Sequence, residues 1–258
     1  MSNLRFYSPE NLRVGGTVKL SDNAATHATR VMRLNVGDKL FLFDGSGNDY
    51  ECELISVQKN ASLAKVLSAI AVKNESPINI TLLLGISAGD RMDIGLQKAV
   101  ELGVNKIAPI KTERSVVKLD EEKAKKRLLH WQNVVIAACE QSGRAILPLI
   151  ETPVTLSAWL QANIHEASGD VKMISALNGT KSTRILLDPL AEKKLADLPK
   201  PGGAIELLIG AEGGLSANEI ALSQQFGFIG VQLGQRILRT ETAPLAAIAA
   251  MQTLWGDF

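Results

Sequence analysis

With 258 residues, the chain is long enough for one large domain or two ordinary ones, and its 46% hydrophobic and 21% charged residues are the balance of a globular protein. The formal net charge is +1, and the N-terminal MSNLRFYSPE has no apolar stretch after its first charge, so we expect no secretory signal. No apolar stretch approaches the roughly 20 residues of a membrane span, so we expect no transmembrane helix. Two cysteines outside any CxxC pair and three scattered histidines argue against a disulfide scaffold or a metal site and favour a cytoplasmic location.

The first 72 residues have the pattern of short strands. A strand near Thr17–Leu20 precedes AATHATRVMRL, for which we expect one short helix. DKLFLFDGSGNDYECELISV then alternates apolar and polar residues around a glycine-containing turn, which predicts a β-hairpin. The polar segment KNESP ends in proline and is typical of a linker. We therefore predict a β-domain over residues 1–72 and a linker over 73–77.

Basic charge is concentrated in this predicted domain. Residues 1–40 contain six basic and three acidic side chains, and the first fifty residues carry five of the eleven aromatic residues. Basic charge beside aromatic residues is typical of a surface that binds nucleic acid. The alternative is a domain whose aromatics form the core and whose arginines are solvated, and composition alone favours this alternative. The candidate phosphate contacts are Arg5, Arg13, Arg30 and Arg33.

The hydrophobic pattern changes after residue 77. INITLLL predicts a buried strand, RMDIGLQKAVEL an amphipathic helix closed by Gly103, and NKIAPI the next strand. This order implies a parallel sheet with crossover helices, so we predict an α/β domain over residues 78–258. A long helix is expected from about Asp120 to Ser142, and a last helix from Thr242 to about Trp255. Further strand candidates are VKMISAL, IELLIG and FIGVQL.

The segment LLIGAEGGLSANEI, residues 207–220, combines a strand, a glycine turn and a helix. Its three glycines allow positive φ and a close approach to a ligand, and Ser216 with Glu219 forms a capping box. The segment lacks GK[ST] and has G-x-x-G-G rather than G-x-G-x-x-G spacing, so it is not a P-loop. Glu212 also places negative charge where a pyrophosphate needs amides. From this segment alone, a ligand cradle and a tight turn without a ligand are equally open.

A second segment repeats the arrangement near the C-terminus. LGQRILRTETAPLAAIAAMQ, residues 233–252, has a strand end, a glycine, a polar loop and a helix. The helix is apolar on every side, so it must be buried, and a second subunit is one way of burying it. Two glycine-bearing loops at the carboxyl ends of strands predict a crevice where α/β sheets bind ligands.

These two segments together resemble the RsmE-type methyltransferases, which methylate N3 of a uridine in 16S ribosomal RNA. GDRMDIGLQKAVELGV, ERSVVKL, AACEQSGR and the N-terminal HATRVMRLNVGDKLFLFDG match that family too, so the resemblance spans nearly the whole chain. Where the family usually has proline this chain has Ala211, and where it often has a basic residue this chain has Ala88. The resemblance implies a small N-terminal PUA-like β-barrel domain that binds RNA and a C-terminal SPOUT methyltransferase domain with a parallel sheet and a trefoil knot.

The resemblance also implies a cofactor and partners. The methyl donor is S-adenosylmethionine, and the partners are 16S rRNA, naked or within the assembled small ribosomal subunit, and a second copy of the chain in a homodimer. A sulfonium cation tolerates Glu212, which a pyrophosphate does not. We expect the cofactor to contact mainly backbone groups of three loops. The candidate residues are Leu177, Leu208, Ile209, Gly210, Glu212, Gly213, Gly214, Leu233, Gly234, Leu238 and Thr240.

The requirements of methylation at uridine N3 indicate which residues are candidates for catalysis. N3 of uridine is a poor nucleophile while it holds its proton, so the site must remove that proton or stabilise the anion over O2, N3 and O4. Arg236 and Arg239 are the expected stabilisers, since a guanidinium donates to carbonyl oxygens and stays charged. Glu241 is expected to orient an arginine, with proton acceptance as its alternative. Arg91 and Arg144 join the candidate RNA contacts, although a solvated helix end is an equal alternative for Arg144.

Two other functions fit parts of the sequence. GISAG, residues 85–89, has the G-x-S-x-G pattern of a hydrolase nucleophile and would make Ser87 catalytic. His130 and His165, the only histidines that follow it, lie in segments that do not suit a triad, which argues against this function. The second is an RNA-binding protein without catalysis, which would use the basic N-terminal domain and leave the cradle empty.

Overall fold

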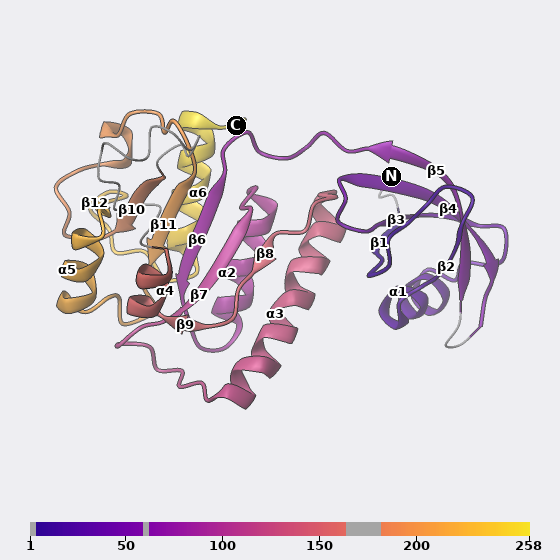
Figure 1. The fold of residues 1–258 in the computed structure, drawn as a ribbon, viewed down its shortest axis with the longest axis horizontal. Helices are drawn as coiled ribbons and strands as arrows, with labels where there is room; N and C mark the ends of the chain where they lie inside the picture. The colour runs from indigo at the N-terminus through magenta and orange to yellow at the C-terminus, as the bar shows by residue number, and fades with distance from the viewer. Residues whose placement is uncertain (1–3, 59–61, 164–181) are drawn as a thin grey trace. The chain divides into compact units, whose positions relative to one another are not determined.

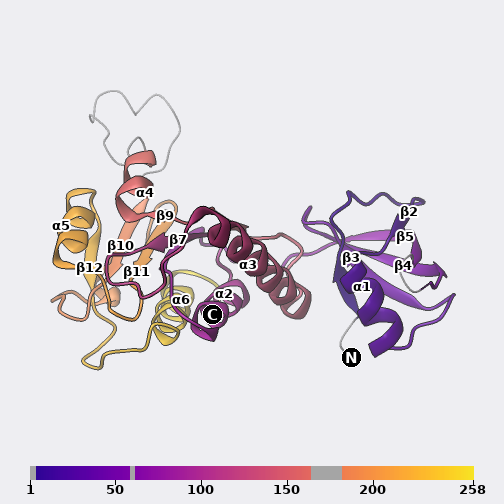
Figure 2. The ribbon, with the colours of Figure 1, turned by 90° about the horizontal axis from the view of Figure 1, so that it is seen from below.

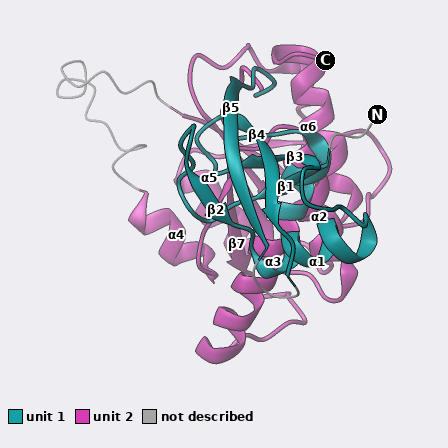
Figure 3. Cartoon of the chain, turned by 90° about the vertical axis from the view of Figure 1, so that its right-hand side faces the viewer, with its two compact units in different colours: residues 1–75, 136–147 teal, residues 76–135, 148–258 magenta. Residues whose placement is uncertain are grey.

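The computed structural model describes residues 4–58, 62–163 and 182–258. The chain divides into two compact units, shown in Figure 3. The N-terminal unit contains residues 1–75 and 136–147, and the C-terminal unit contains residues 76–135 and 148–258. Residues 136–147 group with the N-terminal unit although they are distant from it in sequence. The assignment of functions to residues 1–72 and 78–258 stays a prediction.

The N-terminal unit is built on a curled five-stranded sheet of order β1-β3-β4-β5-β2 (Figure 1). β1 pairs with β3 in parallel and the other pairs are antiparallel, and the predicted hairpin is β3 with β4. The core beneath the sheet contains Phe6, Leu40, Leu42 and Leu54. The strands are β1 (Arg5–Tyr7), β2 (Thr17–Lys19), β3 (Lys39–Phe43), β4 (Asn48–Ser56) and β5 (Leu63–Ala71).

The helical segment of this unit differs from the single helix expected. An α-helix, α1 (Asp22–Thr26), continues directly as a π-helical turn, His27–Val31. The Ser21 side chain caps α1 by accepting from the Ala24 N–H, and the Met32 N–H closes the π turn on the His27 carbonyl at 3.0 Å. π-helical turns are rare and propensity patterns do not predict them.

Three of the aromatic residues counted in the sequence are core residues. Phe6, Phe43 and Tyr50 are all less than 10% exposed. The Arg5 guanidinium lies over the Phe43 ring, 3.9 Å from its centroid. The alternative in which aromatic residues fill the domain core is therefore right for these three.

The C-terminal unit contains a seven-stranded, all-parallel sheet of order β12-β10-β11-β6-β7-β8, with β9 also pairing with β7. The predicted buried strands β6, β7 and β11 are nearly continuous apolar runs, as expected where both faces of a sheet are covered. The strands are β6 (Ile80–Gly85), β7 (Lys106–Lys111), β8 (Leu149–Ile150), β9 (Val154–Thr155), β10 (Thr183–Leu187), β11 (Ile205–Ile209) and β12 (Ile229–Val231).

The described part of residues 78–258 has the helices expected from the sequence and one more, α4, which the sequence pattern did not indicate. The expected long helix is α3, and Asp120 caps it by accepting from the Lys123 N–H at 2.8 Å. The strand expected at VKMISAL lies outside the described residues. The helices are α2 (Asp90–Glu101), α3 (Glu121–Ser142), α4 (Leu156–Ala162), α5 (Ala217–Gln225) and α6 (Thr242–Trp255), with a 3₁₀ turn at Leu195–Asp197.

The apolar helix α6 packs against α2, as Figure 2 shows. Ala247, Ile248 and Met251 are fully buried, whereas Leu254 is 44% exposed. One face of α6 is therefore covered within this chain and another is not. Among the described residues, no helix is both long enough and apolar enough to cross a membrane.

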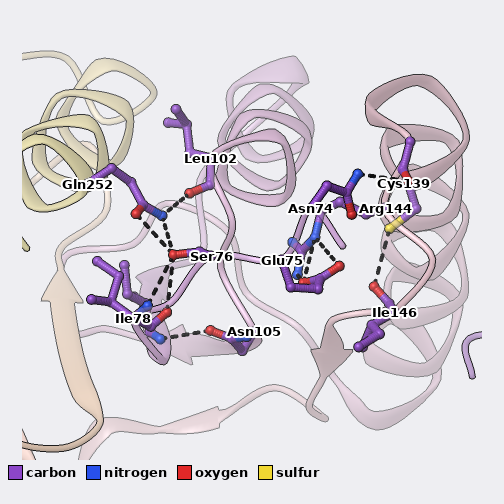
Figure 4. A network of polar contacts seen from close by, with 12 residues as sticks. Asn74, Glu75, Ser76, Ile78, Leu102, Asn105, Cys139, Arg144, Ile146 and Gln252 are labelled. Atoms are coloured by element: carbon purple, nitrogen blue, oxygen red, sulfur yellow. Dashed lines mark hydrogen bonds and ion pairs between the residues drawn. The ribbon is translucent and has the colours of Figure 1, made fainter. Parts of the chain in front are cut away.

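Polar contacts fix the chain near residues 74–76 (Figure 4). In the C-terminal unit, the Gln252 amide of α6 donates to Ser76 Oγ at 2.9 Å and to the Leu102 carbonyl at 2.7 Å. In the N-terminal unit, the Arg144 guanidinium bonds to the Glu75 carboxylate, with Nη2 2.5 Å from Oε2. The predicted linker is thus held by specific bonds at its end.

Candidate active site

The turn after β11 is a compact glycine loop. The Gly214 N–H donates to the Ala211 carbonyl at 2.8 Å, and Gly214 has φ +68°, a conformation that glycine adopts at little cost. A Cβ on Gly210 would lie 2.7 Å from the Gly214 carbonyl carbon, so the two arms of the turn touch. The turn also packs on β6, because a Cβ on Gly85 would lie 2.2 Å from the Ala211 nitrogen. Glycine is required here for close backbone packing.

The predicted capping box fixes the exit from this turn. Ser216 Oγ accepts from the Glu219 N–H at 3.1 Å, and Glu219 Oε2 accepts from the Ser216 N–H at 2.8 Å. The other oxygen of Glu219 accepts from the Glu113 N–H at 2.9 Å. One buried carboxylate therefore starts α5 and ties it to the segment that follows β7.

The second glycine loop runs from Leu233 to Glu241 and contacts the first. Thr240 Oγ1 donates to the Gly210 carbonyl at 3.2 Å and lies 3.2 Å from Ser87 Oγ. The Arg239 carbonyl accepts from the N–H groups of Thr242 and Ala243, both at 2.9 Å, and so begins α6. Loops that follow β6, β11 and β12 are thereby held together at the carboxyl ends of the strands, the usual ligand position in α/β sheets.

Both glycine loops line one cavity of about 760 Å³. This volume is in the range of small-molecule and cofactor sites. The wall consists of the ends of β10, β11 and β12, the loops that follow them, and two arginines from elsewhere in the unit. Its residues are Arg91, Arg114, Leu187–Leu190, Ile209–Leu215, Ile220, Val231–Gly234, Arg236–Glu241 and Ala243.

Two carboxylates flank Arg91 at this cavity. Arg91 Nη1 lies 3.2 Å from Glu212 Oε1, and its Nε lies 3.9 Å from Glu241 Oε2. Burial raises the pKa of Glu212, but hydrogen bonds from the Ala88 N–H, its own backbone and Arg91 outweigh burial and hold that pKa below its ordinary value. Glu212 is therefore ionised at neutral pH. Glu241 Oε2 is buried and makes no hydrogen bond among the described residues.

Most of the predicted cofactor and catalytic residues meet at this cavity. Arg236, Arg239 and Glu241 line it, and so does Arg91, expected as an RNA contact. The arginine beside Glu241 is Arg91. The predicted cofactor residues that line the cavity are Ile209, Gly210, Glu212, Gly213, Gly214, Leu233, Gly234, Leu238 and Thr240.

One described cofactor candidate does not line the cavity. Leu208 is fully buried in the core of the C-terminal unit and does not line the cavity, because alternate residues of a strand point to opposite faces. Leu177 lies outside the described residues. Among the described residues, the third loop at the cavity is Leu187–Leu190, which follows β10.

The expectation that Arg5 and Arg144 contact RNA is wrong, because both side chains are buried. Arg5 pairs with Asp49 at 2.8 Å and donates to the carbonyls of Cys139 and Arg144. Arg144 is 3% exposed and pairs with Glu75. Neither guanidinium is available to a phosphate. Arg13, Arg30 and Arg33 are exposed and stay candidate RNA contacts.

Sequence reasoning missed some of the cavity wall. Arg114 lines the cavity and its Nη1 donates to the Gly213 carbonyl at 3.3 Å. It belongs to ERSVVKL, a segment that matched the family without suggesting a role. The loop Leu187–Leu190 was also missed, although the apolar run of β10 before it was a usable signal.

Ser87 does not have the surroundings of a hydrolytic nucleophile. It is 6% exposed, and its hydroxyl contacts the Gly85 carbonyl and Thr240. His130 pairs instead with Asp93, at 2.6 Å. The serine is therefore part of the packing between loops.

Comparison with known proteins identifies the family. A family model described as an RNA methyltransferase domain matches residues 74–252, and one described as an RNA methyltransferase PUA domain matches residues 20–67. The chain belongs to this RNA methyltransferase family. It is 34% identical to the ribosomal RNA small subunit methyltransferase E of Buchnera aphidicola subsp. Schizaphis graminum over 98% of this chain and 97% of that protein. The Bacillus subtilis enzyme of the same name is 33% identical, with 93% of each chain covered.

Solved structures of family members have the same fold. A ribosomal RNA small subunit methyltransferase E from Neisseria gonorrhoeae, bound to S-adenosylmethionine, superposes with a TM-score of 0.86 at 44% identity and covers 99% of both chains. A Legionella pneumophila protein with bound S-adenosylmethionine gives a TM-score of 0.88 at 36% identity over the full length of both chains. The expected α/β methyltransferase fold with a PUA-like N-terminal domain is confirmed, while the trefoil knot stays a prediction.

Proposed function

We propose that this protein transfers a methyl group from S-adenosylmethionine to N3 of a uridine in 16S ribosomal RNA. The observation that carries this proposal is the full-length likeness to a family member whose structure holds S-adenosylmethionine. The cavity at the two glycine loops supports it, because its wall combines the backbone of both loops with carboxylates and arginines. Family membership supports RNA methylation as the class of reaction, and the cavity is the site at which we propose that it occurs.

The residues at the cavity fit S-adenosylmethionine. This molecule supplies an electrophilic methyl group on a sulfonium centre when bound. Glu212 and Glu241 give the cavity two carboxylates, and Glu241 Oε2, which makes no hydrogen bond among the described residues and lies 3.9 Å from Arg91 Nε, offers an acceptor to a cationic ligand. The loops Gly210–Gly214 and Leu233–Leu238 present backbone groups, which suit the polar edges of an adenosine. We assign cofactor binding to these loops together with Thr240.

We assign stabilisation of the uridine anion to Arg236 and Arg239. Both are exposed residues of the second glycine loop that line the cavity. Preorganised cations next to a developing negative charge lower the barrier to its formation. Glu241 holds Arg91 across the cavity wall, and we give it this positioning role rather than proton acceptance. The N3 proton then leaves to solvent water, because the two nearby cations favour the uridine anion, and that anion takes the methyl group as its bond to sulfur breaks. The loops thus bring cofactor binding and anion stabilisation to one place.

The partners form part of the proposal. We propose that 16S rRNA is presented within the assembled small subunit, because RNA recognition depends strongly on folded shape. We also propose a homodimer that covers the exposed face of α6, and a cytoplasmic location, where ribosomal RNA and reduced cysteines coexist.

Isothermal titration of the full chain with S-adenosylmethionine tests the proposal against the RNA-binding alternative. We expect saturable heat with one cofactor per chain. A Thr240→Val variant, which loses the hydroxyl bonded to Gly210, should bind the cofactor more weakly. Absence of heat at millimolar cofactor would favour an RNA-binding protein without catalysis.

A further inference from the structure

The N-terminal unit contains a second hollow, of about 280 Å³. Its floor is made by Phe6 and Arg5, which are 5% and 7% exposed. Its walls come from the α1 segment and from the end of α3, two parts of the unit that are distant in sequence. The remaining lining residues are Leu4, Asn23, His27, Met32, Ala137, Glu140 and Gln141.

The polar side chains of this hollow have unused hydrogen-bonding capacity. Among the described residues, the amides of Asn23 and Gln141 and the ring nitrogens of His27 make no hydrogen bond. Glu140 Oε1 accepts from the Tyr7 N–H at 2.9 Å. The other carboxylate oxygen, Oε2, makes no hydrogen bond to any described residue. By contrast, Arg5 is occupied by Asp49 and two carbonyls. The hollow therefore offers amide donors and acceptors and one carboxylate acceptor.

The hollow also contains an aromatic ring and a thioether beside these polar groups. The His27 ring meets the Phe6 ring edge-on, with centroids 5.6 Å apart, and His27 is an exposed residue. Met32 is 42% exposed at the same hollow. An aromatic ring with a polarizable thioether beside a set of amides is a surface on which a planar, hydrogen-bonding ligand can stack.

Unusual backbone shapes this wall. The π-helical turn His27–Val31 presents His27, and Arg33 just after it has φ +56°, which is uncommon for a residue other than glycine. Both features concentrate at functional sites in proteins. They also place two exposed arginines, Arg30 and Arg33, in the segment that borders the hollow.

From these features we propose that the hollow holds an unpaired nucleobase of the RNA substrate, distinct from the base that is methylated. Proteins recognise single-stranded RNA by stacking splayed bases on aromatic side chains and bonding their edges, while arginines contact the backbone. The free Glu140 oxygen accepts an N–H, which adenine, cytosine and guanine offer from an exocyclic amino group and uracil and guanine offer from a ring nitrogen. The proposal rests on the proposed function, because it takes RNA as the substrate.

The test is a double variant, Asn23→Ala with Gln141→Ala, in the full chain. The matched control is Gln132→Ala with Asn133→Ala, which removes the same two amides from exposed positions of α3 outside the hollow. We expect the double variant to weaken filter binding of naked 16S rRNA by about tenfold. KM for small ribosomal subunits should rise similarly, with kcat, cofactor affinity and Tm unchanged. The control should behave as wild type.

Unchanged RNA affinity and unchanged KM in the double variant, at wild-type Tm, would overturn the nucleobase pocket. Equal losses in the double variant and in the control would overturn it as well. These outcomes differ from failure of the proposed function. If the wild-type chain transfers no methyl group at all, the proposed function fails, and filter binding still decides whether the hollow contributes to RNA affinity.

Discussion

Among single residues, Arg239 gives the most direct test of the proposed chemistry. Its side chain is exposed at the cavity, and within the described part of the chain its carbonyl, at the start of α6, is the one group of this residue that forms hydrogen bonds. We therefore expect Arg239→Ala to lower turnover at least tenfold and to leave cofactor affinity almost unchanged. The readout is methyl transfer to small subunits at saturating cofactor. Arg127→Ala, at an arginine outside the cavity, is the control, and near-normal turnover of Arg239→Ala would remove the assigned role.

A second arginine, Arg5, is expected to contribute to the stability of the protein rather than to its chemistry. Its removal leaves Asp49 and two carbonyls without their donor in a largely buried cluster. Breaking a buried ion pair in this way typically costs about 3 kcal/mol or more, and we expect Arg5→Ala to lower the free energy of unfolding by about that amount. Urea denaturation followed by circular dichroism measures it.

Arg13 provides the comparison for Arg5, since it is exposed and pairs with no carboxylate of the described residues. Arg13→Ala should change the free energy of unfolding by less than about 0.5 kcal/mol. A cost for Arg5→Ala as small as this would mean that the cluster does not stabilise the unit. Because the partners of Arg5 are 44 to 139 residues away in sequence, no local pattern distinguishes its role from that of Arg13.

At the scale of elements, the contact between β6 and the turn after β11 determines whether the cavity can form. An added Cβ on Gly85 would meet backbone atoms of Ala211 and Gly210 at 2.2 and 2.6 Å, which no side-chain movement can relieve. We expect Gly85→Ala to weaken S-adenosylmethionine binding at least tenfold and to lower Tm. Isothermal titration and thermal melting measure the two effects.

Gly202→Ala is the matched control for this substitution. A Cβ at Gly202 has nothing within 4 Å, so this variant should bind cofactor normally. Wild-type cofactor affinity in Gly85→Ala would show that the close approach of β6 to the turn is unnecessary for the site.

The same elements show how much the sequence could predict. Apolar runs, the capping box of Ser216 and the glycines of both loops are local signals, so most of the longer strands, α5, α6 and most of the cavity wall were predictable, whereas β8, β9 and β10 were not expected. The roles of Arg91 and Arg114 depend on contacts made across more than 90 residues. The π-helical turn and the grouping of residues 136–147 with the N-terminal unit likewise depend on tertiary contacts, which local propensity does not encode.

For the whole molecule, the uncovered face of α6 predicts association. Leu254 is 44% exposed on a helix whose other positions are almost all apolar, and such a face is usually covered in solution. We expect light scattering after size exclusion to give twice the 27.7 kDa mass of one chain. Leu254→Glu should shift the protein towards the monomer, whereas a wild-type monomer at micromolar concentration would contradict the proposed homodimer.

The reaction itself is the most direct test of the account. Small ribosomal subunits from a strain that lacks this protein are incubated with the full chain and S-adenosylmethionine, and the digested 16S rRNA is analysed by mass spectrometry. The account predicts one new methyl group, on N3 of a single uridine, and none when cofactor is omitted. Methylation of another atom or another nucleotide, or no methylation by a chain that binds the cofactor, would contradict it.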